Sequence, residues 1–311
     1  MYTTLLVPID GSKFSARALP VAAALARRTG ATLHVALVND PSAYIPFVPG
    51  EVAVPLYDAD LVKERREADQ LTIDREVVAL TAQGVRAVGT LLDGTVVETL
   101  VEYGQQIASE LTIMTTHGRG GFARLRLGSI ATAYLTRATT PVLLVHGTEL
   151  SAEHSEEKGV YAPTLPTAPL LCALDGSPFA ETMLPHAAQF ADACGLTIEL
   201  FSVTTPHSVD MAPFGTESLL ADPTALQLEE EGRRAYLTRM AAACPPGTTT
   251  HCVTDMTAGR AILEEAVRIN AGAIAMATHG RGGLSRMVLG SVADEVLRHA
   301  TVPMLIYRPE K

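Results

Sequence analysis

The chain has few cysteines, and their spacing matches no motif. The 311 residues contain four cysteines, all in the second half, and no two follow a CxxC pattern. Cysteines scattered in this way are typical of small buried side chains in a reducing compartment, not of a disulfide framework. We therefore expect a cytoplasmic protein.

Basic runs and long apolar runs are also missing. The formal net charge is -10 and the pI is about 5.4, with no run of Lys and Arg to supply a local positive patch. Nucleic acid is therefore not an expected partner. No apolar run reaches the roughly 18 residues of a membrane span, and the opening MYTTLLVPIDGS lacks the basic start of a signal peptide. A membrane partner is not expected either.

Histidine spacing typical of a metal site is missing as well. Two histidines, His117 and His279, lie in glycine-rich loops, where either could act as a general base. A backbone role in the loop is favoured, because no Ser, Cys or carboxylate lies at a recognisable spacing from them. The others show no ligand spacing, so no zinc site and no catalytic residues are expected: His34, His146, His154, His186, His207, His251 and His299.

What the chain does have is an internal repeat. Hydrophobic residues make up 47% of the sequence, enough for full cores in about two domains. Asp10-Gly11-Ser12 returns as Asp175-Gly176-Ser177 at an offset of 165, which also relates Gly94 to Gly259. The loop that begins at Thr116 returns at Thr278, at an offset of 162. We expect a first copy over 1–147, a second over 169–311, and a three-residue loss between Gly94 and Gly118.

The segment between the copies, 148–168, is rich in Glu, Ser, Thr and Pro and is expected to be a linker. Within each copy, short apolar runs alternate with helix-length amphipathic runs, which predicts a parallel, doubly wound sheet. In the first copy the predicted strands are Thr3–Ile9, Thr32–Val38, Val85–Leu92, Leu111–Thr115 and Val142–Val145. The predicted helices run from Ser12 or Ser15, as the cap, to Gly30, and over 60–83, 95–108 and 129–137.

The glycine-rich loop over 115–129 is the strongest candidate for chemistry. Its glycines permit positive φ and the close approach of backbone N–H groups to a ligand. Ser129 stands where a helix begins, which suits an anionic phosphate, and Arg119 could add a charged contact. The alternative is that the loop only makes tight turns and that Ser129 is a helix cap. Neither a P-loop nor a dinucleotide fingerprint is present.

Two further features each have a structural explanation and a functional one. Asp10 and Asp175 follow buried strands, so they could line a ligand site or serve only as turn residues before glycine. The charged runs at 63–70 and 228–234 are interpreted as solvated helix faces with i,i+4 ion pairs.

The arrangement resembles the universal stress protein family in its tandem form. The family loop has the pattern Gly-x-x-Gly, nine residues, then Gly-Ser/Thr. Gly118 with Gly128-Ser129 and Gly280 with Gly290-Ser291 match it. Thr115 and Ala277 replace the first glycine. The resemblance implies two five-stranded, Rossmann-like (adenine nucleotide α-hydrolase-like) α/β domains. Their last strands, Val142–Val145 and Met304–Tyr307, would pair within one chain as a pseudo-dimer.

The resemblance also implies which residues hold an adenine nucleotide. In the first copy they are Pro8, Ile9, Asp10, Val38, Thr115, His117, Gly118, Arg119, Gly128, Ser129 and Ile130. In the second copy they are Ala173, Leu174, Asp175, Val203, Ala277, His279, Gly280, Arg281, Gly290, Ser291 and Val292. Because the Thr115 side chain is larger than that of Ala277, the second copy is expected to bind ATP more readily.

The function implied is ATP binding, alone or with Mg²⁺, with little turnover, by a sensor or stabiliser in a cytoplasmic stress response. A homodimer is an assembly that the resemblance allows. One alternative is a weak ATPase or phosphotransferase, although beyond Asp10 and Asp175 no residue suggests itself for holding a metal or activating a nucleophile. The other alternative is an interaction module that holds no nucleotide.

Overall fold

The chain divides into two compact units, a first over Met1–Leu165 and a second over Pro166–Lys311. The computed structural model describes residues 1–40, 59–116, 127–145, 165–205, 223–278 and 289–309. No helix in these ranges is long and apolar enough to cross a membrane. The four cysteines, Cys172, Cys194, Cys244 and Cys252, are free thiols.

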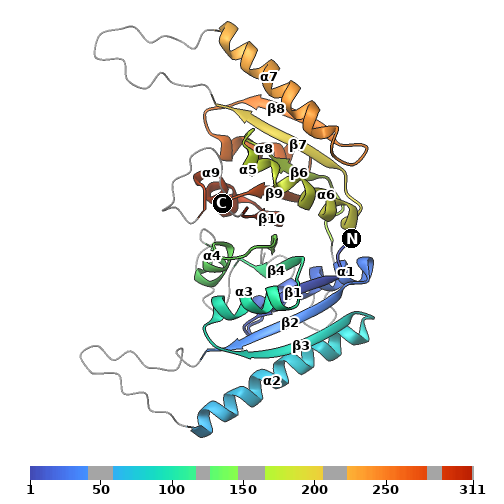
Figure 1. The fold of residues 1–311 in the computed structure, drawn as a ribbon, viewed down its shortest axis with the longest axis vertical. Helices are drawn as coiled ribbons and strands as arrows, with labels where there is room; N and C mark the ends of the chain where they lie inside the picture. The colour runs from blue at the N-terminus through green and yellow to red at the C-terminus, as the bar shows by residue number, and fades with distance from the viewer. Residues whose placement is uncertain (41–58, 117–126, 146–164, 206–222, 279–288, 310–311) are drawn as a thin grey trace, which may run out of the picture. The chain divides into compact units, whose positions relative to one another are not determined.

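The first unit is a parallel sheet with helices between its strands (Figure 1). Its strands lie in the order β3-β2-β1-β4-β5, and their described pairings are all parallel. The strands are β1 (Thr4–Ile9), β2 (Thr32–Asn39), β3 (Arg86–Asp93), β4 (Leu111–Thr115) and β5 (Val142–Val145). The helices are a 3-10 turn η1 (Ser15–Arg17), α1 (Ala18–Thr29), α2 (Ala59–Ala82), α3 (Val96–Gln106) and α4 (Ser129–Leu135).

The second unit repeats this topology, with strands in the order β8-β7-β6-β9-β10 and parallel pairings. Its strands are β6 (Leu170–Ala173), β7 (Ile198–Thr204), β8 (Thr249–Thr254), β9 (Ala273–Ala277) and β10 (Met304–Tyr307). Its helices are α5 (Pro178–Glu181), α6 (Met183–Cys194), α7 (Pro223–Ala241), α8 (Ala258–Arg268) and α9 (Ser291–His299). The predicted doubly wound α/β fold, in two copies, is confirmed.

Helices cover both faces of the first sheet, as two adjacent residues of β3 show. A Cβ built at Gly89 would lie against Ile73 of α2, and the next residue, Thr90, contacts the hydroxyl of Tyr103 on α3. Because successive residues of a strand point to opposite faces, α2 and α3 lie on opposite sides of the sheet. Strands buried on both faces are apolar throughout, as in the fully buried Val142–Val145.

The first helix ends as predicted but begins later. Gly30, with φ 75°, ends α1 in the left-handed conformation that glycine adopts without strain. Ser12 does not cap this helix, because its hydroxyl accepts the N–H of Ser15, the first residue of the 3-10 turn. The helix begins only at Ala18, and no side chain caps it. The prediction that Ser12 or Ser15 caps the long helix was therefore wrong.

The strand pairings also correct the alignment of the two copies. Ala36 of β2 pairs with Thr90, and its counterpart Phe201 pairs with His251, so β3 and β8 are related by an offset of 161. The following helices begin at Val96 and Ala258, an offset of 162. The offset of 165 between Gly94 and Gly259 was therefore coincidental. The second copy is therefore four residues shorter ahead of β8 and regains one residue between β8 and α8, which leaves the net difference of three.

Candidate functional site

In the first unit, β1 and β4 pair only over the first part of their length. Their pairing ends at Leu6 and Thr112, although β1 continues to Ile9 and β4 to Thr115. The two strands therefore separate toward their carboxyl ends. The strand order also reverses here, since β2 and β3 lie on one side of β1 and β4 lies on the other. Ligands of doubly wound sheets bind at such a point.

The second unit separates at the equivalent place, where the pairing of β6 with β9 ends at Cys172 and Ala275. The strand β9 goes on to pair with β10 as far as Ala277 and Tyr307. Both units thus present the same carboxyl edge, and the described residues of the predicted site lie along it.

In the first unit a turn that follows β1 engages the Asp10 carboxylate. Oδ1 of Asp10 accepts the N–H of Ser12 at 2.9 Å and the hydroxyl of Ser15 at 2.6 Å. Gly11 between them has φ 78°, in the left-handed region that favours glycine. The turn role that the sequence allowed for Asp10 is confirmed.

The second unit makes the same turn with a different set of donors. Oδ1 of Asp175 accepts the N–H of Ser177 at 2.8 Å, whereas Ala180 stands where Ser15 stands in the first unit and has no hydroxyl to donate. Instead, Arg233 reaches from α7 and donates from a guanidinium nitrogen to the Asp175 carbonyl at 2.8 Å. This contact places a cation beside the turn.

The Gly-Ser pair has the same geometry in both units. The N–H of Gly128 donates to the Thr116 carbonyl at 2.7 Å, and the N–H of Gly290 donates to the Thr278 carbonyl at 2.8 Å. A Cβ at Gly290 would lie 2.8 Å from the Thr278 oxygen, closer than packing allows. Both glycines have negative φ, −60° and −57°. A close approach to protein backbone therefore explains the glycine at position 290, and neither Gly128 nor Gly290 has the positive φ expected of the loop's glycines.

Each serine of this pair is the first residue of its helix. Ser129 begins α4 and Ser291 begins α9, and both side chains are exposed. The cap positions belong to Gly128 and Gly290, so the alternative that Ser129 is the helix cap was wrong. The helix offers no acceptor for the N–H groups of its first turn, which leaves them suited to an anion.

The remaining predicted residues differ in exposure. Pro8, Ile9, Thr115, Ala173 and Leu174 are buried, Val38, Val203, Ala277 and Val292 are half-buried, and Ile130 is exposed. His117, Gly118, Arg119, His279, Gly280 and Arg281 lie outside the described residues.

Each of the two units matches a known protein family. A model of the universal stress protein family matches residues 1–146 and 167–308. This chain belongs to the universal stress protein family. Its tandem form is confirmed, because the two matched segments fall in the two units.

Relatives of this universal stress protein match it over most of its length. A universal stress protein of Mycolicibacterium smegmatis is 28% identical over 313 residues, which cover 98% of this chain and 97% of the relative. One of Mycobacterium tuberculosis is 28% identical over 287 residues, 90% of each. A solved universal stress protein from Archaeoglobus fulgidus, 20% identical, aligns with a TM-score of 0.63 over 99% of this chain and 98% of its own, which shows a shared fold.

Sequence reasoning missed Arg233, because it belongs to a run interpreted as a solvated helix face. That interpretation holds for its neighbour Arg234, which pairs with Glu230 at 3.5 Å in an i,i+4 arrangement. Arg233 instead turns toward the sheet. Tyr236, one turn further along α7, is only 9% exposed, and burial together with the carboxylates of Glu181 and Asp175 raises the pKa of its hydroxyl.

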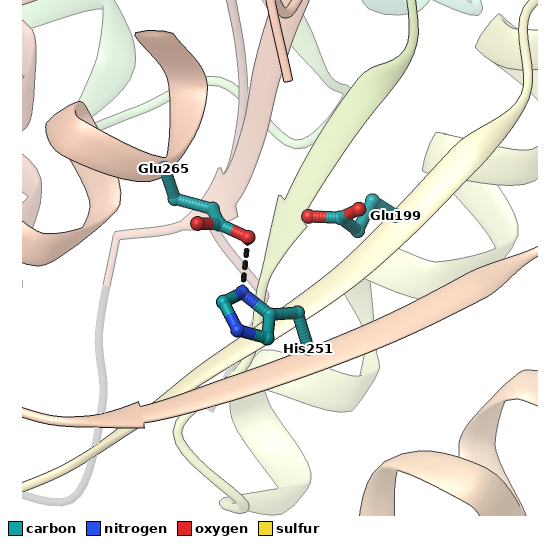
Figure 2. Close-up of side chains that lie close together, drawn as sticks. All are labelled: Glu199, His251 and Glu265. Atoms are coloured by element: carbon teal, nitrogen blue, oxygen red, sulfur yellow. Dashed lines mark hydrogen bonds and ion pairs between the residues drawn. The ribbon is translucent and has the colours of Figure 1, made fainter. Parts of the chain in front are cut away.

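A second polar cluster in the same unit lies away from this edge (Figure 2). It joins Glu199 of β7, His251 of β8 and Glu265 of α8, and Nδ1 of His251 contacts Oε1 of Glu265. Burial raises the pKa of Glu265, but its hydrogen bonds, of which that from Arg268 is the strongest, together outweigh burial and bring that pKa down. Burial and the neighbouring Glu265 raise the pKa of Glu199. The sequence gave no sign of this cluster, because its members are separated by 52 and 14 positions.

Proposed function

We propose that this universal stress protein binds ATP at the carboxyl edge of each unit and acts as a nucleotide-dependent sensor or stabiliser in a cytoplasmic stress response, with little turnover. The observation that carries the proposal is the helix start that follows Gly290 and Gly128. In each unit a glycine is fixed against the preceding strand, and an exposed serine opens a helix beside the point where the central strands separate. Phosphate groups favour this environment.

Three differences support tighter binding by the second unit. The Asp10 carboxylate accepts a hydroxyl from Ser15, a bond that Ala180 cannot offer Asp175. The buried Thr115 of the first unit is replaced by the smaller, half-buried Ala277.

The third difference is the charge on the helix that flanks the turn. Arg66 of α2 contacts Asp93 at the end of β3, and Glu230 of α7 contacts Thr254 at the end of β8, so these two helix positions correspond. Three residues further on, the first unit has Asp69 where the second has Arg233. A guanidinium near the edge favours an anionic ligand, and a carboxylate opposes it.

A count of bound nucleotide tests the proposal. We expect denatured, purified protein to release an adenine nucleotide, identified by mass and counted per chain, and calorimetry of the emptied protein to show ATP binding. No release together with no binding would favour the interaction module. Steady multiple turnover that is lost in Asp10→Ala or Asp175→Ala would favour the enzyme.

Ser291→Glu is the sharper variant, because its effects on binding and on stability have opposite signs. A carboxylate in the first turn of a helix stabilises that helix by about 0.3–1 kcal/mol. The same carboxylate would occupy the place of the phosphate. We expect Ser291→Glu to keep or gain thermal stability and to lose most of its ATP affinity. Ser291→Ala should lose little of its ATP affinity.

The first unit provides the matched comparison. Ser129→Glu adds the same charge at the equivalent helix start, and we expect it to release less of the co-purified nucleotide than Ser291→Glu does. Equal losses would contradict the ranking of the two sites, and unchanged ATP affinity in both variants would contradict the phosphate assignment.

A further inference from the structure

The polar cluster of the second unit brings three ligand atoms to one point. The carboxylates of Glu199 and Glu265 and the imidazole of His251 each offer one such atom, and these lie within 4.8 Å of one another. Figure 2 shows the three side chains converging from two neighbouring strands and the helix that covers them. Glu265 is only 4% exposed, whereas the His251 side chain is 39% exposed. The cluster is thus anchored in the core and open to solvent on one side.

One cation already contacts this cluster. Arg268 binds Glu265 through both carboxylate oxygens at 2.7 Å and reaches Glu199 at 3.2 Å. Its side chain is 54% exposed, so the guanidinium can turn into solvent when another cation takes its place beside the buried Glu265. Two carboxylates therefore face one guanidinium.

The first unit shows that the fold does not require these charges. By the alignment of the strands and helices above, the three positions correspond to His34, Thr90 and Tyr103. There the Tyr103 hydroxyl contacts Nδ1 of His34 at 3.0 Å and the Thr90 hydroxyl at 2.7 Å. This set contains no carboxylate, and Gln106 stands where the second unit has Arg268. The acidic groups are therefore a feature of the second unit alone.

We propose that Glu199, His251 and Glu265 bind a divalent transition-metal ion, with Zn²⁺ as the expected occupant. An imidazole nitrogen with two carboxylate oxygens is a ligand set that Zn²⁺ accepts, with water completing the coordination. The two carboxylates balance its charge. When the metal is absent, the Arg268 guanidinium binds the two carboxylates, and the metal displaces it.

This site is separate from the nucleotide edge. Glu199 is the second residue of β7, four residues before Val203, which corresponds to about 13 Å along a strand. The metal proposal therefore does not depend on ATP binding, and its test needs no nucleotide.

Equilibrium dialysis of the full chain against Zn²⁺ tests the site. We expect one tightly bound ion per chain. The affinity should fall about tenfold or more, equivalent to about 1.4 kcal/mol, in His251→Ala and in Glu265→Gln. Glu264→Gln is the matched control, because it makes the same charge change at the neighbouring exposed position. That variant should bind as the parent does.

Arg268→Ala separates a metal site from an ion-pair network. If Arg268 competes with the metal, its removal should tighten Zn²⁺ binding while lowering stability in the absence of metal. A purely structural network predicts the loss of stability with no gain in Zn²⁺ affinity. The proposal is overturned if no saturable binding occurs, if binding survives His251→Ala unchanged, or if Arg268→Ala does not tighten it. His251 is only half-buried, so His251→Ala keeps the test decisive should Glu265→Gln fail to fold.

Discussion

Glu110 lies immediately before β4, and its side chain forms hydrogen bonds with the start of the central strand β1. Its carboxylate accepts the N–H groups of Thr3 and Thr4 and the hydroxyl of Thr3. Partial burial raises the pKa of Glu110, but these hydrogen bonds outweigh it and hold the pKa below the usual 4.5. These hydrogen bonds favour the ionised form of Glu110. They therefore stabilise the folded protein fully above the pKa that Glu110 has in the unfolded chain, and this stabilisation is lost as the pH falls through the lower pKa of the folded protein.

We therefore expect Glu110→Gln to lower the free energy of unfolding by about 1 kcal/mol near neutral pH, because the amide retains an acceptor and loses only the charge. The parent and the variant should converge as the pH falls below the usual value of 4.5. Urea unfolding followed by circular dichroism at a series of pH values checks this, since the chain has no Trp to report by fluorescence. Glu102→Gln, at an exposed position of α3, is the control. A stability difference that does not vary with pH would contradict the assignment.

Residue roles could be predicted where they depend on local geometry. For Asp10 and Asp175 a turn role was one of two possibilities that the sequence left open, and the hydrogen bond that an Asp-Gly pair makes two residues away is present in both units. Arg233 acts 58 positions from Asp175, and its helical neighbours are those of any solvated face. The His251 cluster depends in the same way on a strand pairing that residue spacing does not reveal. The sequence therefore predicts local roles and misses those created by packing.

At the scale of elements, the apolar pattern predicted the strand bounds and the starts of α2, α3 and α4 in the first unit to within one residue, and failed at the start of α1. Leu111–Thr115, Val142–Val145 and Met304–Tyr307 have the bounds expected, because a strand buried on both faces is marked by its apolar run. The start of α1 was wrong, since a 3-10 turn and an α-helix present the same residue types. The alignment of Gly94 with Gly259 failed because one shared glycine carries little information where the neighbouring residues differ.

The packing of α2 on β3 allows no side chain at Gly89. A Cβ there would lie 2.2 Å from Cγ2 of Ile73 and 2.8 Å from Cγ2 of Val77. We expect Gly89→Ala to lower the free energy of unfolding of the first unit by about 1–3 kcal/mol, as overpacking does in cores. Hydrogen exchange resolved by peptide checks this and assigns the loss to the first unit.

Gly232→Ala makes the same chemical change with the opposite expected sign. Gly232 lies in α7 with nothing within 4 Å of a built Cβ, so alanine should stabilise the second unit by up to about 1 kcal/mol through helix propensity alone. If Gly89→Ala and Gly232→Ala both destabilised the protein, crowding at position 89 would not explain the loss of stability in Gly89→Ala.

At the scale of the whole molecule, each unit has a core of its own, so the protein need not unfold in one transition. A ligand stabilises the unit that binds it. ATP at about 100 times its dissociation constant would add about 2.7 kcal/mol to that unit. We therefore expect limiting ATP to slow hydrogen exchange in β6 and β9 of the second unit before it slows exchange in β1 and β4 of the first.

Saturating ATP should then protect both sheets, and Ser291→Glu should remove the protection from β6 and β9 alone. Equal protection of the two sheets at every ATP concentration would mean that the sites are equivalent. In that case the Ser15 hydroxyl on Asp10, the bulk of Thr115 and the exchange of Asp69 for Arg233 would have no measurable effect on binding. Two copies of one fold with the same helix start would then bind equally, whatever the differences around the Asp10 and Asp175 turns.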